Sequence, residues 1–168
     1  ITALWKAGAM AFGELFAVPS SYGESLDATA LRSSLETIGQ LGGLATIHAE
    51  EVMPGNPRDL ASHNRLRGPA GETRAVSLIA GWQHQCRIHF CHLSTASAVT
   101  AAGSASVEVT PHHLFLSYEQ ALATDTSCKV NPPLRTEAER RRLWSAWERI
   151  DVIASDHAPH TLQEKAVS

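Results

Sequence analysis

The sequence predicts an α/β protein, and within that class a (β/α)8 barrel of which this chain holds about strands 4 to 8. Three observations support the prediction. Short apolar runs alternate with amphipathic stretches, four of the five runs end in side chains that bind metals or protons, and the chain has only 168 residues. Strands that alternate with helices are typical of parallel sheets.

Five runs have the length and the β-branched or apolar composition of buried strands. They are residues 11–17, 44–48, 87–92, 106–110 and 151–156. Helices are expected between them at residues 27–40, 72–82 and 137–149. The first is the clearest, because Leu31, Leu35 and Ile38 recur at helical spacing and two glycines follow it.

The ends of the strands favour a barrel over a doubly wound sheet. His48, His92, the pair 112–113 and Asp156 each close a run. A barrel gathers such groups in a ring at the carboxyl ends of its strands, whereas an open sheet gathers its ligand in one crevice. Because a barrel needs eight strands and about 200 residues, we expect roughly three further N-terminal strands, with 1–168 as the C-terminal part of a single domain.

Composition argues against several kinds of partner. The formal net charge is −3 and no basic stripe occurs, which argues against nucleic acid. No apolar run approaches the roughly 20 residues of a membrane span. Three cysteines are an odd number, and they are expected as reduced thiols in a cytoplasmic protein.

His48, His92 and Asp156 offer two imidazoles and a carboxylate, which suit zinc, with manganese, cobalt or iron as alternatives. Any one of them alone is more typical of a hydrogen-bonded rim residue, but three in register on parallel strands favour a metal site. Asp156 is also a candidate general base. Strand alternation turns Cys91 away from its neighbour, which favours a buried thiol, and His63 is expected in a loop.

Several segments resemble the dihydroorotases, cyclic amidohydrolases of the amidohydrolase superfamily. Residues 155–165, SDHAPHTLQEK, are similar to the last barrel-strand motif of that family. Residues 108–116, EVTPHHLFL, resemble its seventh strand, and residues 129–135, KVNPPLR, its substrate loop. His48-Ala49-Glu50 and residues 91–95, CHLST, resemble the ends of the fifth and sixth strands.

The resemblance implies a TIM-type barrel that reversibly hydrolyses dihydroorotate to carbamoyl aspartate in pyrimidine synthesis, using metal-activated water. It implies two zinc ions, with His48 and His92 on one and Asp156 on the other as the catalytic acid and base. Asn131 and His160 would hold the substrate. The first-strand His-x-His pair and the substrate arginine of the family are not in this sequence.

Glu14 marks a departure from the family. Relatives carry a lysine whose carbamate bridges the two metals, in a pattern like GFKIF, where this chain has FGELF at 12–16. Glu14 falls at the bridging position, and a carboxylate also offers two anionic oxygens. The other interpretation is a rim carboxylate paired with a cation, and the sequence leaves both open.

Two rival functions follow from the same motifs. One is a related cyclic amidohydrolase, such as an allantoinase or a dihydropyrimidinase. The other is a catalytically inactive subunit that only scaffolds a partner. The expected partner of the enzyme is its small-molecule substrate, and either a homo-oligomer or a complex with aspartate transcarbamoylase is compatible with the resemblance.

Overall fold

The computed structural model describes residues 1–17, 26–120, 126–161 and 163, and its centre is one parallel sheet. The strands are β1 (Ala11–Phe16), β2 (Leu44–His48), β3 (Arg87–Phe90), β4 (Ser106–Val109) and β5 (Val152–Ile153). They lie side by side in sequence order, each parallel to the next. Because the order never reverses, the sheet is part of a barrel rather than a doubly wound sheet. The five expected strands are confirmed.

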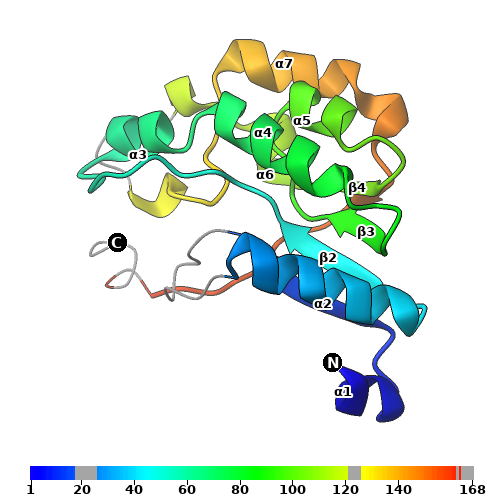
Figure 1. Ribbon diagram of the computed structural model, residues 1–168. Helices are drawn as coiled ribbons and strands as arrows, with labels where there is room; N and C mark the ends of the chain where they lie inside the picture. Colours follow the sequence, from blue (N-terminus) through cyan, green and yellow to red (C-terminus); the bar gives the residue numbers. More distant parts are fainter. Residues whose placement is uncertain (18–25, 121–125, 162, 164–168) are drawn as a thin grey trace.

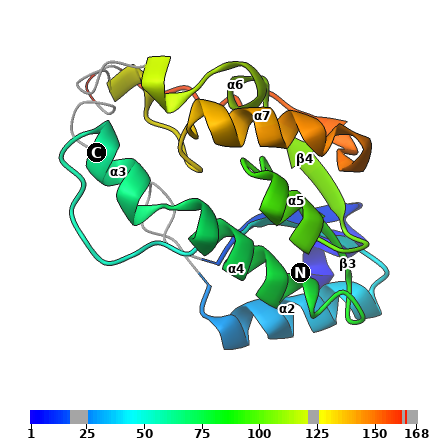
Figure 2. The same cartoon turned by 90° about the horizontal axis from the view of Figure 1, so that it is seen from above.

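The helices are α1 (Thr2–Lys6), α2 (Ala28–Gln40), α3 (Leu60–Leu66), α4 (Pro69–Ala80), α5 (Ala96–Ala101), α6 (Pro111–Phe115) and α7 (Glu137–Ser145). Short 3-10 turns lie at Tyr118–Gln120, Thr126–Cys128 and Trp147–Arg149. Figures 1 and 2 show α2, α4, α5 and α7 following one another in that order along the sheet. Among the residues described, no helix has both the length and the apolar character needed to cross a membrane.

Helix α2 illustrates why the predicted helices form. The Asp27 carboxylate caps it by accepting from the Ala30 amide at 2.7 Å. Leu31, Leu35 and Ile38 are at most 1% exposed and pack in the main core. Burying each of these side chains contributes roughly 1.5–3 kcal/mol, so the apolar stripe rather than local propensity fixes this helix on the sheet.

Two predicted helix boundaries were wrong. Helix α4 begins three residues before the expected start at Glu72, because Pro69 fits the first turn of a helix. The expected helix 137–149 ends at Ser145 and continues as a 3-10 turn. Helices α1, α3, α5 and α6 were not predicted, since segments of five to seven residues are too short to show a helical period.

The two faces of the sheet differ in chemistry. Residues that point toward the helices are fully or almost fully buried apolar side chains, namely Ala45, Ile47, Ile88, Phe90, Val107 and Val109. Most of the alternate residues of the same strands are polar, namely Thr46, His48, His89, Ser106 and Glu108. Strand alternation therefore separates a hydrophobic layer under the helices from a polar face, and the polar face carries the site.

A bulge in β1 sets the direction of one site residue. Phe12 pairs with Ala45 and Leu15 with Ile47, so two residues of β1 lie opposite one of β2. A Cβ at Gly13 would meet the Thr46 carbonyl oxygen at 2.4 Å, and the residue has φ +153°. Only glycine fits there, and the bulge brings the following Glu14 to the polar face.

Candidate metal centre

Three side chains from three strands converge at the carboxyl end of the sheet. Glu14 lies on β1, His48 ends β2 and His92 follows β3. The Oε1 atom of Glu14 lies 2.6 Å from His92 Nε2 and 3.3 Å from His48 Nδ1. The two imidazole nitrogens lie 3.2 Å apart. The structure thus brings together three of the four predicted metal ligands.

The geometry of these atoms fits a divalent cation. Nitrogen and oxygen ligands at about 2.1 Å from a tetrahedral zinc ion are roughly 3.4 Å from one another. The separation of His48 Nδ1 from His92 Nε2 is 3.2 Å, and from Glu14 Oε1 it is 3.3 Å. The third separation, 2.6 Å between Glu14 Oε1 and His92 Nε2, is a hydrogen-bond distance, so these two atoms would have to move apart by about 0.8 Å to bind the same ion. Two imidazoles and one carboxylate also match the donor preferences of zinc. The residues present therefore fit the metal that the fold implies.

The charges of the cluster reinforce one another. Burial raises the pKa of Glu14, but hydrogen bonds to His48 and His92 outweigh it and lower the pKa to about 2. Burial lowers the pKa of His48, whereas hydrogen bonds to Glu14 and Glu50 outweigh it and raise the pKa to about 9. Two carboxylates therefore favour positive charge at this point, and a divalent cation held by the same atoms would provide it.

Asp156 lies near the same three residues, just after β5. Burial raises the pKa of its carboxyl, the negative charges of Glu14 and Glu108 raise it further, and His92 and His48 oppose the rise. Much of the residue is open to solvent, while its carboxyl group is half-buried among these neighbours. Its carboxylate thus belongs to the electrostatic environment of the cluster, while its role as a ligand and as the acid and base stays a prediction.

Two of the predicted site residues have left-handed backbones. The φ angle is +37° at His92 and +49° at Asp156. At His92 the Glu108 carboxylate accepts from the backbone amide at 3.2 Å. This conformation ends the strand alternation, so our expectation that Cys91 and His92 face opposite sides was wrong. Cys91 lies on the polar face with His89 and Glu108.

The thiol of Cys91 is nevertheless a weak nucleophile in this setting, because it stays protonated in the absence of a metal. Burial raises its pKa to about 12, together with the nearby carboxylates of Glu14 and Glu108. Cys86, Cys91 and Cys128 are all free cysteines, in agreement with the expectation of reduced thiols.

The two predicted substrate residues lie on different segments. Asn131 and His160 are both partly buried. The Asn131 Oδ1 atom is buried and has no hydrogen-bond partner among the described residues, so it is a polar atom that a ligand could satisfy. The roles of both residues stay predictions. The end of the motif at 155–165 falls on residues 162, 164 and 165, which lie outside the described residues.

Glu50 contacts the cluster, and sequence reasoning did not identify it as part of the site. Its carboxylate is 1% exposed, lies 3.2 Å from His48 Nε2 and forms an ion pair with Arg67. If His48 Nε2 donates to Glu50, the opposite nitrogen Nδ1 presents its lone pair to the cluster. The position of Glu50, two residues after the histidine that ends β2, could have identified it from the sequence.

We expect Glu50→Gln to weaken metal binding by about 10–100-fold, because a ligand histidine loses the partner that orients it. The measurement is a chelator competition on the complete protein. Glu51→Gln is the matched control, since Glu51 is exposed and pairs with Arg74 at the surface. Equal metal affinity in the two variants would contradict an orienting role for Glu50.

Three other histidines differ in their surroundings. His63 lies in α3 and not in a loop, and its buried Nε2 lies 3.0 Å from the Val130 carbonyl. His113 is buried in α6, with Nε2 2.9 Å from the Pro132 carbonyl. His89 contacts Ser106 and Glu108 on the polar face. The prediction for His63 was wrong because a seven-residue helix gives little periodic signal.

The fold defines the chain as part of a (β/α)8 barrel, with a candidate metal centre at the carboxyl end of its sheet. It superposes on the L-hydantoinase (dihydropyrimidinase) of Arthrobacter aurescens with a TM-score of 0.86 at 23% identity, covering 97% of this chain and 41% of that one. No protein-family model matches the chain.

Sequence comparison points to one kind of cyclic amidohydrolase. The chain is 36% identical to a dihydroorotase of Halobacterium salinarum over 174 residues, covering 97% of this chain and 41% of the relative. It is 37% identical to a dihydroorotase of Methanopyrus kandleri over 171 residues, covering 96% and 40%. The chain is similar to dihydroorotases over nearly its whole length, and it spans about two fifths of the length of these relatives.

Proposed function

We propose that the complete protein is a dihydroorotase, which reversibly hydrolyses the cyclic amide of (S)-dihydroorotate to N-carbamoyl-L-aspartate in pyrimidine synthesis. Residues 1–168 then form the C-terminal part of its single barrel domain. The observation that carries the proposal is the convergence of Glu14, His48 and His92 at one end of the sheet, within 4.8 Å of one another. This convergence occurs in a chain whose sequence is similar to that of dihydroorotases.

Glu14 Oε1, His48 Nδ1 and His92 Nε2 would hold one divalent cation, and the donor chemistry favours zinc. Asp156 would hold a second cation, with Glu14 between the two. When bound, such cations lower the pKa of water and polarise an amide carbonyl. The proposal therefore needs two metals for each site.

Asp156 would move the proton. As a carboxylate it accepts a proton from the attacking water and then gives that proton to the departing amide nitrogen. In the chain without metal, burial and neighbouring carboxylates raise the pKa of Asp156, and His92 and His48 oppose the rise.

Asn131 and His160 would bind the ring carboxylate and the amide edge of the substrate. The unpaired Oδ1 of Asn131 suits an N–H donor of the ring. Neither residue has a metal role in this proposal. The side chains would therefore contribute to substrate binding alone.

Replacing Asn131 or His160 with alanine is expected to weaken transition-state binding by on the order of 2–4 kcal/mol, because polar groups of the substrate lose their partners. Steady-state kinetics and metal analysis on the complete protein check this. Metal content should equal that of the unaltered protein. Metal loss in Asn131→Ala would show that the residue belongs to the metal shell instead.

The decisive test of the reaction compares substrates. The complete protein should act on dihydroorotate and not on allantoin or dihydrouracil. Preference for dihydrouracil would favour a dihydropyrimidinase, the kind of protein that the fold comparison also matches. An absence of both bound metal and turnover would favour the scaffold subunit. A cytoplasmic location, and assembly as a homo-oligomer or with aspartate transcarbamoylase, are further parts of the proposal.

A further inference from the structure

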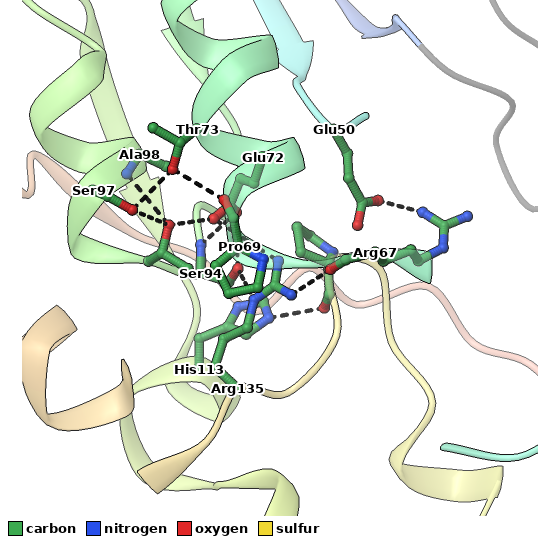
Figure 3. Close-up of polar contacts among 12 residues, drawn as sticks. Glu50, Arg67, Pro69, Glu72, Thr73, Ser94, Ser97, Ala98, His113 and Arg135 are labelled. Atoms are coloured by element: carbon green, nitrogen blue, oxygen red, sulfur yellow. Dashed lines mark hydrogen bonds and ion pairs between the residues drawn. The ribbon is translucent and has the colours of Figure 1, made fainter. Parts of the chain in front are cut away.

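A fully buried carboxylate holds the turn that follows His92. Glu72 on α4 has 0% exposure. Its Oε1 accepts from the Ser94 amide and the Ser94 hydroxyl, both at 2.8 Å, and its Oε2 accepts from the Thr95 hydroxyl at 2.6 Å. Figure 3 shows these contacts gathered around Glu72. The backbone two residues after His92 is therefore fixed to α4.

Arg135 reaches the same turn from the segment that contains Asn131. Its Nε donates to the Ser94 hydroxyl at 2.8 Å, and another guanidinium nitrogen donates to the Arg67 carbonyl (Figure 3). The guanidinium also lies 3.9 Å from Glu72 Oε2. The Ser94 hydroxyl thus accepts from Arg135 and donates to Glu72, so a single atom joins the two charged groups.

The segment around Asn131 is held on both sides of that residue. The His63 Nε2 atom lies 3.0 Å from the Val130 carbonyl, and the His113 Nε2 atom lies 2.9 Å from the Pro132 carbonyl. Arg135, which is 6% exposed, closes the segment. Its contact with Ser94 connects this segment to the turn after His92.

We propose that Arg135 is a positioning residue that couples residues 130–135 to residues 93–95, and so fixes Asn131 relative to His92. Arginine suits this task because its planar fork donates in two directions at once, to Ser94 and to the Arg67 carbonyl. A displacement of about 1 Å between groups that bind and groups that react can cost a large factor in rate. The kinetic consequence rests on the proposed dihydroorotase function, while the coupling itself does not.

The first test is hydrogen exchange on the complete, metal-loaded protein. Ser94→Ala removes the bridging hydroxyl and keeps both charges. Arg135→Lys keeps a cation beside Glu72 but cannot reach both partners. Each variant should raise amide exchange in residues 93–95 and 130–135 together. Arg141→Met is the control, since Arg141 is exposed and forms its ion pair with Glu137, outside both segments. Faster exchange confined to one segment would overturn the coupling.

The second test is kinetic. Ser94→Ala should lower kcat/KM for dihydroorotate by about tenfold at unchanged metal content, and by less than about threefold when Asn131 is already alanine. Such non-additivity is expected of residues that act as a unit. If Ser94→Ala lowered kcat/KM by the same factor with Asn131 present and with Asn131 replaced by alanine, Arg135 would not act through Asn131. If the unaltered protein does not turn over dihydroorotate, the proposed function fails, and the exchange measurement still decides the coupling.

Discussion

Asp156→Asn is expected to lower kcat for dihydroorotate by about 10²–10⁴-fold, the usual contribution of a positioned acid and base. The carboxamide keeps the shape of the side chain but cannot accept the proton of the attacking water. Asp156 is the carboxylate that we propose as the proton acceptor, and it lies close enough to Glu14, His48 and His92 to interact with their charges. The measurement is initial rates in both directions of the reaction, together with metal content.

A carboxylate on the protein surface provides the comparison for Asp156. Glu36→Gln removes a negative charge from the exposed side of α2, where Glu36 lies 3.5 Å from Arg32. Its rate should stay within about twofold of the unaltered protein, because surface pairs contribute little. If Asp156→Asn kept more than a tenth of the activity, another group would have to carry the proton.

Glu14→Gln is expected to lose one metal ion per site or most of the turnover. The change keeps the size of the side chain and removes the charge that faces His48 and His92 at 3.3 and 2.6 Å. Metal stoichiometry and rate on the complete protein decide the matter. Activity should also be independent of bicarbonate and carbon dioxide, because a glutamate bridge needs no lysine carbamate.

The rival interpretation of Glu14 predicts a different result. A rim carboxylate that only pairs with a cation would tolerate Glu14→Gln at a cost of about 0.5 kcal/mol. Full metal stoichiometry and an unchanged rate would therefore return Glu14 to that role. A requirement for bicarbonate in the unaltered protein would contradict the bridge independently of any substitution.

The periodicity of apolar residues in the sequence correctly predicted the strands and the longest helix. Alternation placed His48 at the end of a strand, and helical spacing in 27–40 identified α2 with its buried stripe. Parallel strands then required that His48, His92 and a β1 residue meet at one end of the sheet. The convergence of Glu14 with both histidines follows from this topology, because the carboxyl ends of parallel strands lie together.

The unpredicted parts depend on contacts between distant segments. Arg135 contacts Ser94 across 41 positions of sequence, and His63 contacts Val130 across 67. Neither contact leaves a periodic trace in the sequence. The error over Cys91 has another cause, since alternation holds only while the backbone is extended, and His92 leaves that region with φ +37°.

The left-handed backbones of His92 and Asp156 also limit how the metal preference of this site could be engineered. Asn, Asp and His are the non-glycine residues that occupy this region most readily. A cysteine at position 92 would bring a sulfur donor together with a backbone conformation that it seldom adopts, and a valine or isoleucine would bring backbone strain and no donor atom. His92→Asp keeps a compatible backbone and offers oxygen in place of nitrogen, so it is the route toward harder cations such as manganese or magnesium.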